Sequence, residues 1–242
     1  MASARAAEIL ARLSHGADVV PSLPQQLVLH CTAALSVTGV AIMLMTDAGP
    51  AGAVAASDGP AETMEELQFT LGEGPCIDCS HTGRPVLQPD LAHTGGARWP
   101  VFTDGAIDAG IRAIFAFPLR VGGIRLGVLD LYRDRPGALT AAHLAEALSF
   151  ADAAVTVLVH LQAHAATGQD KTGLLRVIED RAEVHQATGW VAEELGVSLA
   201  QALVMLRARA FASGQPIVDL ARGVLTGTVR LGDVDDSENP SR

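Results

Sequence analysis

The strongest constraint on the fold lies at residues 113–132, where two apolar runs flank a pair of glycines. The runs, Ala113 to Leu119 and Arg125 to Tyr132, have the length and the side chains of β-strands. Gly122 and Gly123 between them can adopt the positive backbone angles that a tight hairpin turn requires. We therefore predict an antiparallel hairpin here, which commits this part of the chain to a sheet.

A second strand pair is predicted nearer the N-terminus. Residues 40–45 place apolar side chains on both faces in alternation, which is typical of a strand buried on both sides. The segment AGAVAAS, after a turn at Ala48–Gly49–Pro50, suits a paired strand. Residues 60–71 form a short helix or a lead-in loop, and the Gly- and Pro-rich residues 72–110 are expected to be a long loop region. This order of elements implies an α+β fold, an antiparallel sheet flanked by helices.

A long helix is predicted after Thr140, whose hydroxyl can cap its first turn. Its apolar residues form two adjacent seams at alternating spacings of three and four. One seam can pack on the sheet while the other meets a partner chain, so we expect a dimer helix. A single wide stripe in a monomer is the alternative. The first seam comprises Leu144, Leu148, Ala151, Val155 and Leu158, and the second comprises Ala147, Phe150, Ala154, Val157 and Leu161.

The C-terminal part is predicted to be an all-α three-helix bundle. Its first helix covers about residues 174–195 and stops at Gly196. Ser198 and Gln201 form a capping box that starts the second helix, and Pro216 starts the third after a break near residue 214. The converging apolar positions are Val184, Ala187, Val191, Leu195, Ala202, Leu203, Leu206, Ile217, Leu220, Ala221 and Val224.

These patterns divide the chain into four segments. Residues 1–164 form the sheet domain with its flanking helices, and residues 174–230 form the helical domain. Residues 165–173, with two glycines and small polar side chains, are a linker. Residues 231–242 are a polar, acidic tail that we expect to be disordered.

Charge limits how the protein can meet a nucleic acid. The net charge of −10 excludes a uniformly basic surface, so a nucleic-acid site has to be a local patch. Residues 1–164 carry 9 arginines against 16 acids, whereas residues 165–230 carry 7 basic and 7 acidic groups. The three cysteines suit a reducing compartment, and we find neither a signal peptide nor an unbroken apolar span. We therefore expect a cytoplasmic protein that does not enter a membrane.

Arginines of the helical domain could supply that local patch. If a tight turn at Gly196–Ser198 makes the first two helices antiparallel, Arg207 and Arg209 return toward Arg181. Guanidinium groups pair with phosphates and stack on bases, which suits a structured RNA loop. Solvated faces paired with nearby acids are the alternative. The second helix presents apolar residues where a DNA-reading helix needs polar ones, so DNA recognition is disfavoured.

Cys76 and Cys79 form a C-x-x-C pair with three interpretations. The pair could bind zinc, with His81 and His93 as further ligands, although no second ligand pair has the usual spacing. It could be a redox pair. The third interpretation is two small, semi-apolar residues that pack in the fold.

Arg98 and Trp99 place an aromatic ring beside a cation in a loop. Trp99 could roof a small-molecule pocket over the sheet or close the core of the domain. The chain shows no nucleophile elbow, metalloprotease motif or phosphate-binding loop, so we expect no enzyme activity.

Several motifs resemble one family. GEGPCIDC, TGRPVLQPDL, RWPVF, GIRAIFAFPLR and LGVLDLYRDRPGALT are similar to the GAF domain of actinobacterial GAF–ANTAR regulators, over about residues 25–160. RAEVHQATGWV and GVSLAQALVMLRARA resemble the ANTAR domain, over about residues 174–230. The resemblance implies a GAF sensor driving a three-helix domain that binds paired hairpins in nascent transcripts and prevents terminator formation. It also implies a dimer.

The resemblance also nominates residues. The family motif R-x-x-I-x-Q-A-K-G falls on residues 181–189, where Thr188 replaces the lysine, and this departure predicts weaker RNA binding or a different target. The predicted RNA-binding residues are Arg181, Gln186, Thr188, Arg207, Arg209 and Arg222. The candidates for contacting a small molecule or redox signal, whose identity is unknown, are Cys76, Asp78, Arg98 and Trp99.

We therefore interpret the protein as a signal-responsive regulator that binds RNA hairpins. A sensor or protein-interaction module whose ANTAR unit has lost RNA binding is the alternative.

Overall fold

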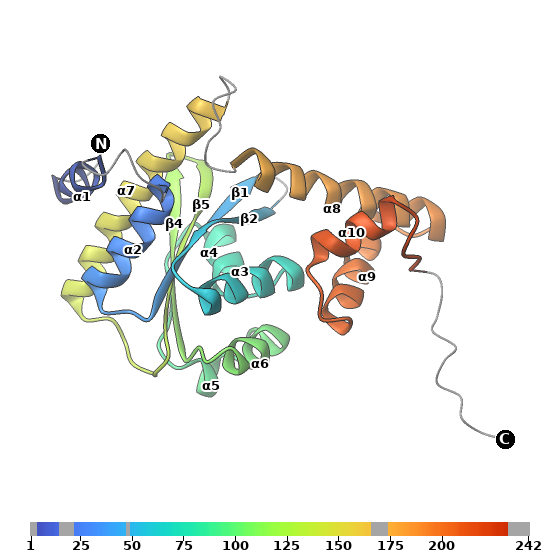
Figure 1. The fold of residues 1–242 in the computed structure, drawn as a ribbon. Helices are drawn as coiled ribbons and strands as arrows, with labels where there is room; N and C mark the ends of the chain where they lie inside the picture. Colours follow the sequence, from blue (N-terminus) through green and yellow to red (C-terminus); the bar gives the residue numbers. More distant parts are fainter. Residues whose placement is uncertain (1–3, 15–21, 47–48, 166–173, 232–242) are drawn as a thin grey trace. The chain divides into compact units, whose positions relative to one another are not determined.

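The computed structural model describes residues 4–14, 22–46, 49–165 and 174–231 (Figure 1). The chain separates into two compact units, Met1–Ile178 and Glu179–Arg242. The predicted linker and acidic tail lie almost wholly outside the described residues, and Ala48 of the predicted turn does too.

The first unit is built on an antiparallel sheet with the strand order β2-β1-β5-β4-β3 among the described residues. The predicted hairpin is confirmed, because β4 and β5 pair along their length and turn at Gly122 and Gly123. β1 is buried at every position but its last and pairs with β2 and β5, as its alternation predicted. The strands are β1 (Gly39–Thr46), β2 (Gly49–Ala56), β3 (Val86–Gln88), β4 (Ala113–Val121) and β5 (Ile124–Arg133).

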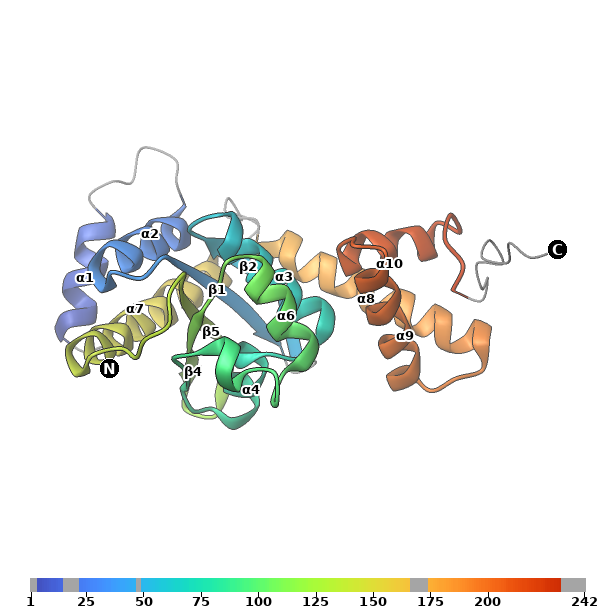
Figure 2. The ribbon, with the colours of Figure 1, turned by 90° about the horizontal axis from the view of Figure 1, so that it is seen from below.

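Helices cover both faces of this sheet (Figures 1 and 2). α1 (Ala4–Ser14), α2 (Leu23–Leu35) and α7 (Ala141–Ala165) lie on one side, where α2 contacts β1 and α7 contacts β4 and β5. α3 (Gly59–Leu71) and α4 (Pro75–Thr82) pack on the other side, against β1 and β2 and against β4 and β5 respectively. The short helices α5 (Leu91–Thr94) and α6 (Pro100–Asp108) extend this second layer.

The main core lies between the sheet and α7. The second predicted seam of α7 is fully buried, and Thr140 caps the helix through a hydrogen bond from the His143 N–H, 3.1 Å. The first seam is split, because Ala151 and Leu158 are buried whereas Leu148 is 46% exposed. α7 is long and apolar enough to cross a bilayer, but its packing on β4 and β5 identifies it as a core helix.

Two predictions for the first unit were wrong. Gly49 and Pro50 belong to strand β2 instead of to a turn. Residues 72–110 are mainly helical, with α4, α5, α6 and strand β3, where a long loop region was expected. The reason is that Pro75 and Pro100 occupy first helical turns, where a missing N–H has no cost, so these prolines begin helices.

The second unit is the predicted three-helix bundle. α8 (Leu174–Leu195) ends at Gly196, whose φ of 64° is the left-handed value that favours glycine. The capping box at the start of α9 (Leu199–Ala212) is formed in both directions. α10 (Ile217–Leu225) follows Pro216. Of the predicted core positions, all except Leu195 and Leu203 are buried, and these two are half-buried.

Candidate functional site

Arg181 of α8 and Arg207 of α9 lie close together in the second unit. Arg181 is only 5% exposed, and its pKa is lowered to about 10 by burial and by the positive charge of Arg207. Burial also lowers the pKa of Arg207, and both burial and Arg181 lower that of His185. Both guanidinium groups are still protonated at neutral pH. The two helices therefore bring together two partly desolvated positive charges, although the chain bends by 109° between them instead of turning back antiparallel as predicted.

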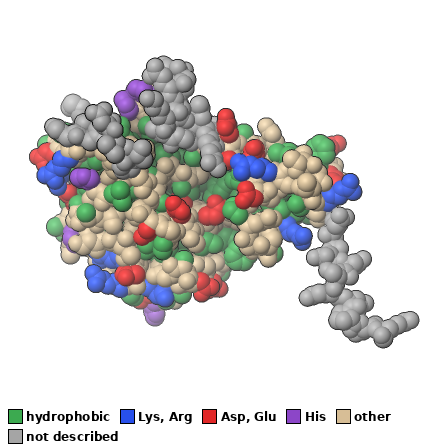
Figure 3. Space-filling model, in the orientation of Figure 1, with side chains coloured by type: hydrophobic (Ala, Val, Ile, Leu, Met, Phe, Trp, Pro, Cys, Tyr) green, Lys and Arg blue, Asp and Glu red, His purple; other side chains and the backbone are tan. Residues whose placement is uncertain are grey.

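Arg222 of α10 does not add a free charge to this pair. Its guanidinium forms ion pairs with Glu183 at 2.7 Å, with Asp219 at 3.3 Å and with Asp180. Three carboxylates thus surround one arginine. On the face shown in Figure 3, basic side chains of the second unit likewise stand beside acidic ones.

The remaining predicted RNA-binding residues occupy different environments. Gln186 and Arg209 are exposed. Arg209 follows Arg207 by two positions, a rotation of about 200° around the helix, so these two arginines point to different sides of α9. Thr188 is 5% exposed, and its hydroxyl donates to the Val184 carbonyl at 2.7 Å. The structure therefore groups Arg181 with Arg207, whereas Arg209 points to another side of α9, Arg222 is held by carboxylates, and Thr188 is buried in the bundle.

Two exposed aromatic residues of this unit were not among the predicted site residues. Trp190 is 60% exposed and follows Gln186 by four positions, so both lie on one face of α8. Phe211 is 46% exposed and follows Arg207 by four positions on α9. Each aromatic residue lies four positions after a predicted RNA-binding residue and outside the apolar core positions. This spacing could have identified both residues from the sequence.

In the first unit, Glu65, Cys76 and Asp130 form a buried cluster between the sheet and the helices. They come from α3, α4 and β5, and each has a potential ligand atom within 4.8 Å of the others. All three are at most 1% exposed. Asp130 lies on the central strand and is paired with Ala41 and Ala116, whose small side chains leave space above the sheet.

The local backbone fixes the position of Cys76. Gln68 of α3 accepts a hydrogen bond from the Cys76 N–H, 2.7 Å, at the first turn of α4. Gly74 precedes that turn with a φ of 133°, and a Cβ there would lie 2.7 Å from Gln68 Oε1. A side chain at position 74 would therefore displace the amide that holds Cys76.

Burial raises the pKa of every ionisable group in this cluster. The pKa of Asp130 is raised to about 7, chiefly by loss of hydration. The pKa of Glu65 is raised well above its usual value by burial and by the adjacent Asp130 charge. The pKa of the Cys76 thiol is raised for the same reasons. Among the described residues, no side chain outside the cluster donates a hydrogen bond to the two carboxylates, which interact with each other and with Cys76.

Asp78, Arg98 and Trp99 form a separate cluster nearer the surface. Arg98 forms an ion pair with Asp78 at 2.8 Å and lies over the Trp99 ring, 4.6 Å from its centroid. The Trp99 indole N–H donates to Asp78 at 3.2 Å, and the ring is 2% exposed. Trp99 therefore closes the core, the second of its two predicted roles. Of the four predicted ligand contacts, these three are together, whereas Cys76 faces Glu65 and Asp130.

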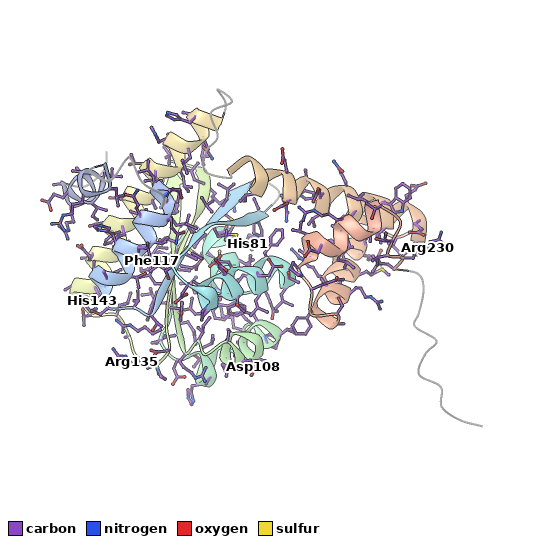
Figure 4. All side chains as sticks on the ribbon, in the orientation of Figure 1. His81, Asp108, Phe117, Arg135, His143 and Arg230 are labelled. Atoms are coloured by element: carbon purple, nitrogen blue, oxygen red, sulfur yellow. The ribbon has the colours of Figure 1, made fainter. Side chains whose placement is uncertain are left out.

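The predicted partners of the cysteine pair lie elsewhere. His81, beside the cysteines on α4, and His93 are both exposed (Figure 4). Cys76 and Cys79 are buried, free thiols on one helix. The side chains that approach Cys76 are the two carboxylates, and sequence spacing could not identify them because they lie 11 and 54 positions away.

Comparison with known proteins identifies both units. Residues 23–159 match the GAF domain family, and residues 173–225 match the ANTAR domain family. No curated protein matches the chain.

Solved structures resemble the first unit at low sequence identity. The GAF domain of a phosphoenolpyruvate-protein phosphotransferase from Acinetobacter is 14% identical, with a TM-score of 0.49, and the match covers 68% of this chain and 99% of that one. The corresponding domain from Coxiella burnetii is 15% identical, with a TM-score of 0.48 and coverage of 69% and 99%. A type II free methionine-R-sulfoxide reductase from Thermoplasma acidophilum is 17% identical, with a TM-score of 0.44 and coverage of 57% and 92%.

Proposed function

The chain belongs to the GAF family and carries an ANTAR domain, and from this premise we propose a cytoplasmic, signal-responsive regulator that binds hairpins in nascent RNA and prevents transcription termination. In this proposal the GAF unit receives the signal and the ANTAR unit contacts the RNA. The protein acts as a regulator and not as an enzyme.

The observation that carries the RNA-binding proposal is the Arg181–Arg207 pair. The positive charge of Arg207 acts on Arg181, so the two guanidinium groups form one cationic position. Both are partly desolvated, and guanidinium pairs with phosphate through two parallel hydrogen bonds. A phosphate of the RNA backbone would be attracted to this position.

Exposed aromatic rings elsewhere on the second unit provide contacts for unpaired bases. Sequence-specific proteins bind RNA loops by stacking splayed bases on aromatic side chains and hydrogen-bonding their edges. Trp190 with Gln186 on α8, and Phe211 on α9, provide side chains of these kinds. Thr188 contributes packing inside the bundle instead of a phosphate contact, so we expect α9 to supply most of the charge.

A filter-binding titration of the full chain with a two-hairpin leader RNA tests the proposal. The double variant Arg207→Met, Arg209→Ala removes two positive charges and keeps the apolar stem at position 207. We expect its affinity to fall at least about tenfold, since each lost contact to a charged group weakens binding by roughly 1.5–3 kcal/mol. The control is Arg135→Ala, because Arg135 is exposed on the other unit (Figure 4).

The control should bind like the wild type. If the double variant keeps its circular dichroism spectrum and also binds like the wild type, the arginine surface is not the RNA site.

One observation favours the alternative, a sensor or protein-interaction module without RNA affinity. Arg222 is held by three carboxylates, and residues 165–230 have equal numbers of acidic and basic groups. A wild-type chain that fails to bind the leader RNA or total cellular RNA at low salt would support this alternative.

We also propose a homodimer through α7. Leu144 and Val155 are half-buried, and Leu148 and Val159 are both 46% exposed. These four residues follow one stripe of the helix at coiled-coil spacing, beside the stripe that packs on the sheet. Covering such a stripe with a second copy would remove its apolar surface from water.

A further inference from the structure

We propose that Glu65, Cys76 and Asp130 bind one divalent transition-metal ion inside the GAF unit. Three different elements, α3, α4 and β5, each contribute one ligand. This site stands independently of RNA binding, because it lies in the other unit and its test measures the metal alone.

The geometry is close to that of a metal site. The three ligand atoms lie within 4.8 Å of one another, so an ion placed centrally among them is about 2.8 Å or less from each, against about 2.0–2.3 Å for zinc bonds to oxygen and sulfur. Each ligand atom would have to move toward the ion by less than about one ångström to reach these bond lengths.

The two buried carboxylates of the cluster indicate a bound cation. Glu65 and Asp130 are at most 1% exposed, and within the described part of the chain their four oxygens have no hydrogen-bond partner outside the cluster itself. Buried carboxylates are normally paired, hydrogen-bonded or bound to a metal, because loss of hydration is otherwise costly. A divalent cation would compensate two of the three negative charges that Glu65, Asp130 and a Cys76 thiolate carry together.

The surroundings of the cluster are rigid enough to hold the ligands. Asp130 is on the central strand of the sheet, between two alanines. Gln68, itself fully buried, holds the backbone of Cys76 through its amide oxygen. Such outer contacts orient metal ligands and tune their affinity.

The donor set selects the class of ion. A thiolate disfavours Mg²⁺ and Ca²⁺, and the mixture of one sulfur with two oxygens suits borderline ions such as Zn²⁺, Fe²⁺ and Co²⁺. Three protein ligands leave a fourth position on a tetrahedral ion, as at sites where zinc binds water or a small molecule. The ion would therefore give the unit a coordination position for a small donor ligand.

The competing explanation is that protons occupy the cluster. In that case Glu65 and Asp130 share a proton and Cys76 remains a thiol. The two explanations differ in one respect, because metal binding requires the thiolate and therefore creates a sulfur–metal bond.

Cobalt binding to the full chain tests the proposal. The chain is unfolded with a chelator present and refolded with Co²⁺, and the near-ultraviolet absorption of a thiolate–cobalt bond is followed to saturation. We expect a band that saturates at one ion per chain and that Zn²⁺ displaces. Cys76→Ser should abolish the band. Cys79→Ser, which changes the other buried cysteine of the same helix, should leave it intact.

A thermal unfolding series provides a second measurement if Cys76→Ser fails to fold. Zn²⁺ should raise the Tm of the wild type, since an ion that binds only the folded state stabilises it. Asp130→Asn should be no less stable than the wild type without metal and should lose the response to Zn²⁺. No cobalt band in the wild type, a band lost in Cys79→Ser, or an equal zinc response in Asp130→Asn would each overturn the proposal.

Discussion

At the scale of single residues, the chemistry of this chain depends on charges buried at specific points. Arg181 and Arg207 were grouped by sequence reasoning on the expectation that α8 and α9 are antiparallel, and the structure brings them together although the bend between the helices is 109°. Asp130 could not be identified in this way, because a single acid in an apolar strand signals nothing until its neighbours are known. Its partners Glu65 and Cys76 come from helices that the sequence left as uncertain or as loop.

Asp130 makes the metal-free GAF unit sensitive to pH. Its pKa is about 7 in the folded chain, against about 3.9 when unfolded, so the folded state binds the extra proton. The stabilising contribution of Asp130 protonation is therefore complete below about pH 4 and is lost as pH rises through about 7. Glu65, whose pKa is also raised, acts in the same direction, and the thiols of Cys76 and Cys79 remain protonated throughout this range.

Thermal unfolding with a chelator at pH 5 and pH 8 measures this effect. We expect a lower Tm at pH 8 for the wild type and a smaller difference for Asp130→Asn. An equal pH difference in both proteins would show that Asp130 is not the titrating group.

At the scale of elements, local sequence patterns predicted most of the helices and strands. The hairpin β4–β5, helix α7 and the three helices of the second unit follow from alternation, helical periodicity and capping residues. The helices of residues 72–110 could not be predicted from such signals, because they are short. Their buried side chains are determined by the packing of α4 and α6, so the sequence shows no clear helical periodicity there. The Glu65–Cys76–Asp130 cluster and the contact of Trp99 with Asp78 depend on this region, so they were accessible only from the structure.

The capping box of α9 is a local interaction whose contribution to the free energy of unfolding can be measured directly. Ser198 accepts a hydrogen bond from the Gln201 N–H, and the Gln201 side chain accepts one from the Ser198 N–H at 3.0 Å. We expect Ser198→Ala to destabilise the second unit by about 1 kcal/mol. Urea unfolding followed by the fluorescence of Trp190 measures this change, and Ser213→Ala, at the opposite end of α9, serves as a comparison at a position without a capping box. No loss of stability in Ser198→Ala would mean that the box contributes nothing in solution.

At the scale of the whole molecule, a GAF unit and an ANTAR unit are joined in one chain, and α7 is the proposed site of dimerisation. Leu148→Glu places a charge in the exposed stripe of α7 without touching the buried one. We expect native mass spectrometry to change from dimer to monomer, while the Tm of the GAF unit changes little. A dimer that persists in this variant would place the interface elsewhere.

The central claim, that the ANTAR unit binds RNA through arginine–phosphate contacts, is tested most directly by salt dependence. The affinity of the full chain for a two-hairpin leader RNA is measured across a series of salt concentrations for the wild type and for Arg207→Met. The logarithm of the association constant should fall linearly with the logarithm of salt concentration, and the slope should be smaller by about one in the variant. A wild type that does not bind, or two equal slopes, would contradict the account.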